Sequence, residues 1–494
     1  RGRALSSRVR LALVAALAVT GPVATIVVSH RRGDRQPPAL AGTCDEAHPC
    51  ASGMAPANGS ASAPSPSIPS RSLVDLPSTK RFTVTPFDQG LPTAGQWRNG
   101  FDVADLNGDG ELDLVHGPAR KTFPLRPVVY LGDGHGNWRA WNETTFPPVG
   151  FDYGDVRAAD LDGDGVLDLA FAVHLKGVAA FRHDGRGNFS SLGRGLDLEV
   201  GAPFGSRTLL TTDWGDDGRQ GILALSDGPR PPSKSNGGAA SLGVRLFTMT
   251  GRNAPRDATR DAAADAPREW KLDALATTAL DRLFGDSLAL GDIDGDGKKD
   301  LAVGSNTLGE TRVLFRRGAG AFVPVPLDGL RARGLVRSVA LADLDGDSRD
   351  DLVVAYANSE GESWFVGVDV FFNRNGTFER REIAREESRN DYTALAVCNF
   401  DGSRARSSLA VARDDGTISL FAADGHGFVT QDLRVPSSGH EGCRGYRVRC
   451  VDLNHDGRDE LVASFAGESD GLSETDDACV SQGALKVWTV GASL

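Results

Sequence analysis

The stretch VRAADLDGDGVLDL, residues 156–169, decides the fold, because it sets a short acidic loop of the form DxDxDGxxD between two apolar runs. The same pattern begins at Asp105, Asp160, Asp292, Asp343 and Asp452, and two degraded copies begin at Asp213 and Asn399. Successive starts are 55, 53, 79, 51, 56 and 53 residues apart. A period near fifty residues indicates tandem repeats, each of which is one supersecondary unit.

Each repeat is expected to contain four strands. The first precedes the acidic loop and the second follows it, as in Leu167–Val173. The third ends in a Gly-containing turn followed by an aromatic residue, which is a hairpin signal. That turn recurs at Gly132–Trp138, His183–Phe189, Arg317–Phe322, Asn373–Phe378 and Ala423–Phe428. Since four antiparallel strands make one blade, the seven repeats predict an all-β, seven-bladed β-propeller.

Two repeats depart from the regular pattern. The third contains insertions around Asp227–Ser241 and Arg252–Glu269, which we expect to be surface loops at hairpin turns. The seventh stops after Leu461–Phe465 and Ala484–Val490 and lacks a fourth strand. Lys80–Phe87, ahead of the first repeat, has the pattern of an isolated fourth strand. We therefore predict that this N-terminal strand completes the last blade and closes the ring.

The fourth repeat closely resembles an FG-GAP repeat, with FGDSLALGD at 284–292, IDGDG at 293–297 and DLAVG at 300–304. Such repeats form the propellers of integrin α-subunits and of many related bacterial proteins. The resemblance extends over Phe82–Leu494, although the GAP part of the motif is replaced, for example by Gly304-Ser305. It implies a seven-bladed propeller, calcium in the loop between the first and second strands, and extracellular adhesion or ligand binding.

The acidic loops have the composition of calcium sites. Calcium takes about six to eight oxygen ligands in a flexible geometry. Positions 1, 3, 5 and 9 of each loop carry carboxylate or amide oxygens, and Gly at positions 4 and 6 permits sharp turns. The predicted side-chain ligands are Asp105, Asn107, Asp109 and Asp113; Asp160, Asp162, Asp164 and Asp168; Asp292, Asp294, Asp296 and Asp300; Asp343, Asp345, Asp347 and Asp351; and Asp452, Asn454, Asp456 and Glu460. The predicted backbone carbonyl ligands at position 7 belong to Glu111, Val166, Lys298, Arg349 and Arg458.

Polar turns without metal are the competing interpretation, since Asp, Asn and Gly all favour turns. We favour calcium because clustered carboxylates repel one another without a cation, and because the octahedral preference of magnesium suits an all-protein cage poorly. The third loop has Gly215 and Gly221 at positions 3 and 9, and the sixth has Ser403 and Ser407 at positions 5 and 9, so we expect both to be empty. About five calcium ions would change the formal net charge from -12 to -2.

The N-terminal region has the pattern of an export signal. Leu11–Val28 contains no charged residue and is flanked by arginines, and its 18 residues just span a bilayer. A retained membrane anchor is favoured and a cleaved signal peptide stays open. The expected organisation is a signal or anchor at 1–32, a flexible Pro/Ala/Ser/Gly-rich linker at 33–79 and the propeller at 80–494, either anchored facing the extracytoplasmic side or secreted.

The 6 cysteines contain no CxxC pair, which argues against a thiolate zinc site. An even number in an exported chain permits disulfides, but the sequence leaves the pairing open. Cys443, Cys450 and Cys479 lie in one terminal region, so a local bridge among them is one hypothesis and free buried thiols are the other.

The composition also limits the function classes. A net charge of -12 argues against nucleic acid as a partner. There is no HExxH or phosphate-binding Gly loop, and the 9 histidines are scattered. We therefore expect a non-enzymatic, calcium-stabilised adhesion or scaffold module that binds an unknown protein or carbohydrate ligand and contacts the membrane only if its N-terminal segment is retained. The alternative is a secreted enzyme, such as a polysaccharide-active lyase or hydrolase, on a calcium-stabilised propeller.

Overall fold

The structure, a computed structural model, describes residues 81–493 apart from several internal segments, the longest of which are 118–125, 230–241, 251–267, 435–443 and 467–483. By its contacts the chain divides into residues 1–73 and 74–494, and every described residue belongs to the second unit. The predicted signal or anchor and the linker lie outside the described residues, as do most of the two insertions. The described part contains strands and no helix. It therefore offers no apolar helix of membrane-spanning length.

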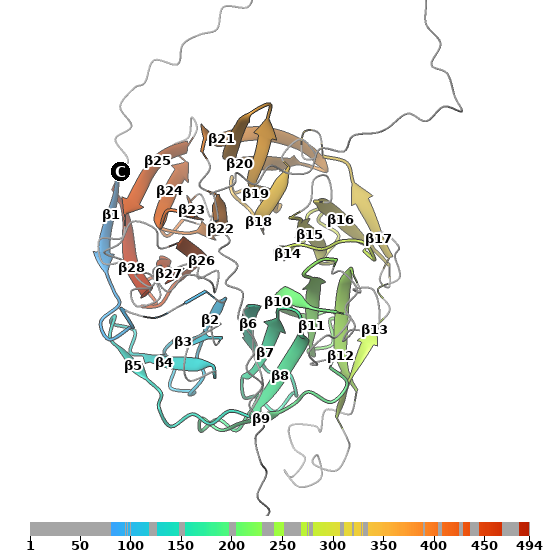
Figure 1. Cartoon of the computed structure of the whole chain (residues 1–494), viewed down its shortest axis with the longest axis vertical. Helices are drawn as coiled ribbons and strands as arrows, with labels where there is room; N and C mark the ends of the chain where they lie inside the picture. Colours follow the sequence, from blue (N-terminus) through green and yellow to red (C-terminus); the bar gives the residue numbers. More distant parts are fainter. Residues whose placement is uncertain are drawn as a thin grey trace, which may run out of the picture. The chain divides into compact units, whose positions relative to one another are not determined.

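Seven antiparallel sheets of four strands surround a common axis (Figure 1). In six of them the strands follow the chain order from the axis outward. The first three blades are β2 (Phe101–Ala104), β3 (Asp113–His116), β4 (Val128–Gly132) and β5 (Trp138–Ala140); β6 (Gly154–Ala159), β7 (Asp168–Val173), β8 (Gly177–His183) and β9 (Phe189–Ser191); and β10 (Ser206–Asp213), β11 (Gln220–Ser226), β12 (Val244–Thr250) and β13 (Glu269–Asp273).

The next three blades have the same order. They are β14 (Ser287–Gly291), β15 (Asp300–Gly304), β16 (Arg312–Arg317) and β17 (Ala321–Val325); β18 (Leu335–Ala342), β19 (Asp351–Glu360), β20 (Ser363–Arg374) and β21 (Thr377–Glu387); and β22 (Tyr392–Cys398), β23 (Ser408–Arg413), β24 (Thr417–Ala423) and β25 (Phe428–Arg434). The seven-bladed, four-stranded propeller predicted from the sequence is therefore confirmed.

The seventh blade is completed by the N-terminal strand, as predicted. It consists of β26 (Arg444–Val451), β27 (Glu460–Ala466), β28 (Ala484–Ser493) and β1 (Arg81–Pro86). β1 pairs antiparallel with β28, from Arg81 opposite Ser493 to Pro86 opposite Trp488. Phe82 is buried and packs edge-on against Phe400 of the sixth blade, with ring centroids 5.9 Å apart. The two ends of the propeller are thus held in one sheet.

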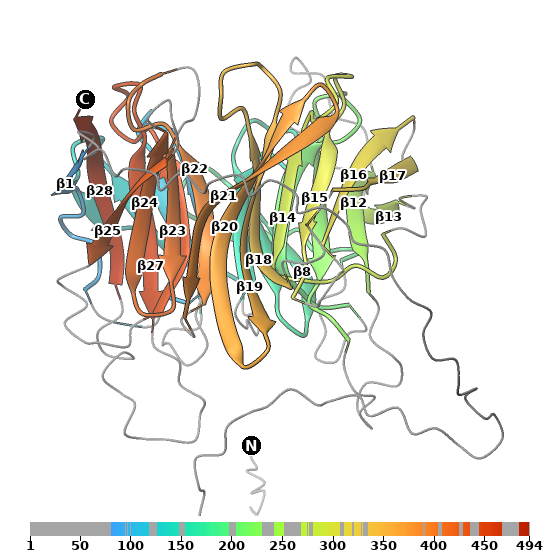
Figure 2. The same cartoon turned by 90° about the horizontal axis from the view of Figure 1, so that it is seen from above.

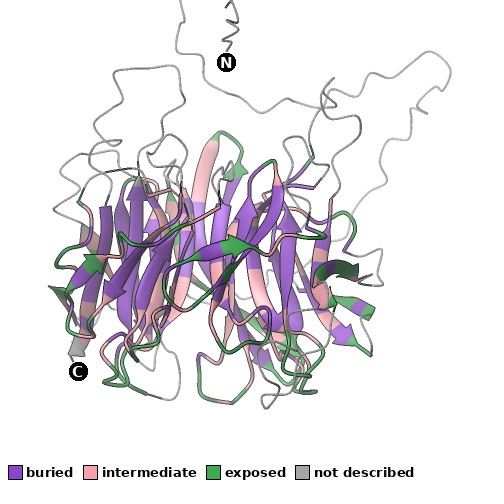
Figure 3. Ribbon diagram, turned by 90° about the horizontal axis from the view of Figure 1, so that it is seen from below, coloured by how far each residue is buried: buried purple, intermediate pink, exposed green. Residues whose placement is uncertain are grey.

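The core lies between the blades, and it explains why the second strands are apolar on both faces (Figures 2 and 3). All six residues of β7 are buried, because each face of its sheet packs against a neighbouring blade. Phe171, for example, lies in one cluster with Val115 of the first blade and with Phe181. Burying such a ring contributes about 1.5–3 kcal/mol. The Trp138 ring is likewise buried and donates its indole N–H to the Phe87 carbonyl at 3.0 Å.

A disulfide joins Cys398 at the end of β22 to Cys450 in β26. The hypothesis of a local bridge involving Cys450 is therefore wrong, and Cys443 and Cys479 lie outside the described residues. The two bridged cysteines are 52 residues apart in sequence, yet their Cα atoms are 5.2 Å apart. Their strands are the innermost strands of adjacent blades, so the bridge ties the sixth blade to the seventh beside the ring closure.

Deletion of residues 80–87 should open the ring. We expect this variant of the full chain to unfold at a lower temperature and to aggregate, because β28 then presents an unpaired edge. Thermal denaturation and light scattering measure the two effects. Deletion of residues 33–72, which retains β1, is the matched control and should change neither. A chain without residues 80–87 that stays as stable and monomeric as the parent would show that other contacts hold the ring.

Replacing both Cys398 and Cys450 by Ser should lower the free energy of unfolding. A loop of this length predicts a loss of about 2–4 kcal/mol, because the unfolded chain gains conformational freedom. Denaturant titration without reductant measures the difference. Reductant should destabilise the parent by a similar amount and leave the double variant unchanged. Equal stability of parent and variant under oxidising conditions would mean that the bridge does not constrain the unfolded chain.

Candidate metal centres

The five intact acidic loops connect the first and second strands of their blades, and each lies where the innermost strand ends. They join β2 to β3, β6 to β7, β14 to β15, β18 to β19 and β26 to β27. Because the blades share one strand order, the loops lie at the same end of every blade.

The first carboxylate of each loop organises the turn. Asp160 accepts hydrogen bonds from the amides of Gly163 at 2.7 Å, Asp164 at 3.1 Å and Gly165 at 2.9 Å. Gly163 and Gly165 have φ angles of 77° and 86°, a left-handed conformation that favours glycine. Asp105 and Asp343 make the same three bonds in their loops. The regular spacing of Asp and Gly in the sequence is therefore the spacing that this tightly wrapped backbone requires.

Two loops place another residue at a left-handed position. Ser348, at position 6 of the fifth loop, has a φ of 67°, and His455, at position 4 of the seventh, has a φ of 59°. A non-glycine residue there costs about 1–2 kcal/mol. Both loops nevertheless keep the backbone path of the others, since the Ser348 amide still reaches Asp343 at 2.8 Å and the Asp456 amide still reaches Asp452 at 3.1 Å.

The acidic residue at position 9 is the most buried predicted ligand of its loop. Asp168 is 0% exposed, and its two carboxylate oxygens accept from the Leu161 amide at 3.1 Å and the His183 amide at 2.8 Å. It therefore ties the acidic loop to the third strand of the blade. The equivalent residues accept a bond from the loop amide at position 2 in every case, namely Asp113, Asp300, Asp351 and Glu460.

Burial makes these position-9 carboxylates hard to ionise. It raises the pKa of Asp168 to about 8, of Asp113 and Glu460 to about 7, and of Asp300 and Asp351 to about 6. Neighbouring carboxylates of the same loops raise these pKa values further, while backbone hydrogen bonds oppose the change. Buried, mutually repelling carboxylates are an environment that a bound cation stabilises.

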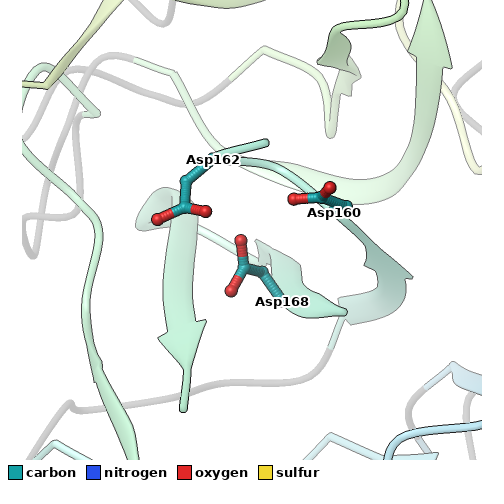
Figure 4. Close-up of side chains that lie close together, drawn as sticks. All are labelled: Asp160, Asp162 and Asp168. Carbon is teal, nitrogen blue, oxygen red and sulfur yellow. The ribbon is translucent and has the colours of Figure 1, made fainter. Parts of the chain in front are cut away.

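Three loops bring three carboxylates together at metal-binding distance. The carboxylates of Asp160, Asp162 and Asp168 point toward one another (Figure 4), and one oxygen from each lies within 4.8 Å of the others. The same holds for Asp292, Asp294 and Asp300, and for Asp343, Asp345 and Asp347.

Among the described residues, two buried carboxylate oxygens in these clusters make no hydrogen bond, Asp162 Oδ2 and Asp292 Oδ1. The first of them is ion-paired with Arg182 and Arg268. An unpaired buried oxygen within a group of carboxylates fits the ligand chemistry of calcium. The residues that would hold the ion are the predicted side-chain ligands, with the backbone at position 7 positioned by its own bond to position 5, as when the Val166 amide donates to Asp164 at 3.0 Å.

The other loops differ in their donors. The first and seventh have an amide at position 3, and the Asn454 side chain donates to Glu460 at 3.1 Å. The degraded third loop keeps the turn, because Asp213 accepts from the amides of Asp217 at 3.1 Å and Gly218 at 2.7 Å, but it has no carboxylate at position 9. The turn therefore survives loss of the ligands. Ser407 of the sixth loop lies outside the described residues.

Basic side chains that the sequence reasoning missed lie over the carboxylates. Arg182 pairs with Asp162 at 2.8 Å and with Asp164 at 2.7 Å, and Arg268 also pairs with Asp162. Arg317 and Arg374 pair in the same way with the fourth and fifth loops. For Arg182, Arg317 and Arg374 the signal in the sequence is a basic residue next to the Gly-containing turn after the third strand. These cations partly neutralise the loops and would compete with a metal ion.

Adjacent loops are also joined around the ring. The Asp292 amide donates to Asp350 of the next loop at 3.1 Å, and the Asn399 amide donates to Asp459 of the seventh at 2.7 Å. Lys299 reaches Thr212 beside the third loop at 3.1 Å. All three linking residues occupy position 8, so this variable position carries contacts between blades.

The fold and its loops together define a propeller whose repeats each carry an acidic loop between the first and second strands. The model of the FG-GAP-like repeat matches residues 124–171 and 292–354 of this chain. The chain thus combines FG-GAP-like repeats with a seven-bladed propeller, an arrangement that resembles the propeller of integrin α-subunits. No match was found among curated proteins.

Asp294→Ala should reduce the response to calcium, whereas Asp401→Ala should leave it nearly unchanged. The first removes a carboxylate from a cluster of three, and the second lies in the loop that we expect to be empty. Sites with dissociation constants of 10⁻⁴–10⁻³ M would each contribute roughly 0.4–1.4 kcal/mol in millimolar calcium. Paired melting curves of metal-free and calcium-loaded protein measure this. Equal responses in the parent and both variants would contradict the assignment.

The stabilisation by calcium should grow between about pH 5 and pH 8. The position-9 carboxyls have pKa values above the ordinary 3.8 of Asp, so the metal-free folded chain binds more protons than the unfolded chain in this range. Its free energy of unfolding therefore falls as the pH rises through that window. Calcium replaces those protons and removes the loss. The melting temperature difference between loaded and metal-free protein is the measurement, and a larger difference at the acidic end would contradict the expectation.

Proposed function

We propose that this propeller is a calcium-stabilised binding module of an exported protein, acting in adhesion or as a scaffold, and that its calcium ions are structural. The observation that carries the proposal is the gathering of three carboxylates in each of three equivalent loops, one of them with the unpartnered buried oxygen of Asp292. The FG-GAP propeller fold is consistent with a binding or scaffold role.

A structural role for calcium follows from where the loops lie. Each ion would cross-link the end of an innermost strand to the start of the second strand, and through the position-9 carboxylate to the third. It would also neutralise carboxylates such as Asp168 that are fully buried and otherwise unfavourable to ionise. We propose about five ions, one in each intact loop, and none in the third and sixth loops.

Export is supported by two further features. The Cys398–Cys450 bridge suits an oxidising compartment, where disulfides persist. The apolar stretch Leu11–Val28 would supply the signal or anchor.

Metal analysis of the full chain after dialysis against trace calcium tests the proposal. We expect about five calcium ions per chain and a melting temperature that rises with calcium. Magnesium at the same concentration is the control and should bind less. A stoichiometry of zero or one ion, or a chain whose melting is indifferent to calcium, would overturn the proposal.

The binding role needs its own experiment. A glycan and peptide array probed with and without calcium should give hits that weaken when metal loss loosens the blades. Because calcium is proposed to act through the fold, the hits should be lost in parallel with the melting transition. Turnover of any bound glycan or peptide during incubation would instead favour an enzyme.

A further inference from the structure

A polar cavity of about 390 Å³ follows the propeller axis, lined by the innermost strands. A second hollow of about 220 Å³ shares Asp286 and Arg447 with it and is lined by Arg207 and Arg337, near the beginnings of those strands. This second hollow forms the mouth of the axial cavity, and it lies at the opposite end of the blades from the acidic loops. The axial cavity is within the range of about 300–1,000 Å³ that is usual for small-molecule sites.

Most charges of this cavity are paired within the ring. Arg337 pairs with Asp391 at 2.7 Å and with Asp286 at 3.4 Å, and Arg207 pairs with Asp286 at 3.3 Å. These contacts join the third to sixth blades around the mouth. On this side of the axis the arginines and aspartates balance in number.

The opposite side carries an excess of positive charge. Arg449 pairs with Asp102 at 3.2 Å, and Arg157 pairs with Asp155 at 2.8 Å. Arg447 is the third arginine here, and among the described residues it has no ion-pair partner. Repulsion from Arg157 and Arg447 lowers the pKa of Arg449, in addition to the larger effect of burial. Three arginines thus face two aspartates where the seventh, first and second blades meet.

This excess is unusual in the chain as a whole. The described lining of both hollows carries six arginines, at 98, 157, 207, 337, 447 and 449, against five aspartates, at 102, 155, 286, 391 and 414, a sum of +1. The whole chain has a net charge of -12. A cavity of net positive charge in an acidic protein is one that an anion can enter against the overall field.

The charge also limits which anion fits. One unpaired guanidinium matches one carboxylate, to which arginine binds through two parallel hydrogen bonds. A phosphate dianion would bring a second negative charge close to Asp102 and Asp155 without a second free cation. The innermost strand is an edge strand of its sheet. Its unpaired N–H and C=O groups therefore face the axis, where they can hydrogen-bond to a hydrophilic ligand.

We propose that the axial cavity binds a small hydrophilic carboxylate, with Arg447 as the residue that pairs with its carboxyl group. Arg157 and Arg449 add to the attraction, and Asp102 and Asp155 hold those two side chains in place. The source of the carboxylate is either a sugar acid or an acidic amino acid. This inference rests on the proposed binding role but not on calcium, because the mouth and the acidic loops lie at opposite ends of the blades.

Isothermal titration of the full chain in millimolar calcium tests the inference. D-glucuronate and the α-methyl ester of N-acetyl-L-glutamate, each with one carboxylate, are the probes, and methyl glucoside and N-acetyl-L-glutamine methyl ester are their neutral counterparts. At least one acid should bind at least tenfold more tightly than its neutral counterpart, and which one binds identifies the source. Equal affinity of acid and neutral probe, tighter binding of inorganic phosphate, or no binding at all would each overturn the inference.

Variants separate charge pairing from folding. Arg447→Gln should weaken binding of the acid at least tenfold. The affinity of Arg447→Lys should lie between those of Arg447→Gln and the parent. Arg139→Gln, at an exposed position of the outer strand β5, is the matched control and should bind like the parent. Melting curves and calcium content of every variant show whether the propeller and its metal sites are intact. Unchanged affinity in folded Arg447→Gln would exclude this residue as the anchor, whereas lost calcium with intact acid binding would count only against the proposed metal sites.

Discussion

Burial of one carboxylate in each of the five intact acidic loops is the constraint on which the rest of the structure depends. At position 9 the carboxylate ties loop to third strand, yet it is removed from water and lies near other carboxylates. Such a group is stable only when it is protonated, hydrogen-bonded or next to a cation. The chain uses backbone amides for every one of these residues and arginines beside three loops. A calcium ion would meet the same requirement, so calcium binding and the stability of the blades are coupled.

The second constraint is that a propeller must close. Each blade covers its neighbours, so the first and last would expose apolar faces if the ring stayed open. Pairing of β1 with β28 removes that edge, and the Cys398–Cys450 bridge fastens the seventh blade to the sixth. Contacts between acidic loops, such as the Asp292 amide with Asp350, extend the same connection around the ring. A change in the backbone of one of these loops would therefore also disturb a hydrogen bond of the adjacent loop.

The two ends of the blades differ in chemistry. Acidic loops gather where the innermost strands end, and paired arginines and aspartates surround the axial cavity where those strands begin. The same innermost strands thus lead into the acidic loops at one end and carry charged side chains of the cavity toward the other. Most arginines of the cavity are held in ion pairs with aspartates, and the Arg447 guanidinium remains for a ligand. Such a cavity would select a ligand with a single negative charge.

The repeat period, the Asp and Gly spacing and the orphan strand at 80–87 were readable in the sequence, because each depends on local backbone chemistry repeated along the chain. These features determined the number of blades, the turn of every acidic loop and the closure. The Cys398–Cys450 pairing, the arginines above the carboxylates and the charge of the cavity were decided only by tertiary structure. They bring together residues from different strands or blades, often fifty or more positions apart. Distance in sequence carries no signal of such contacts, since the ring geometry, and not any local pattern, brings them together.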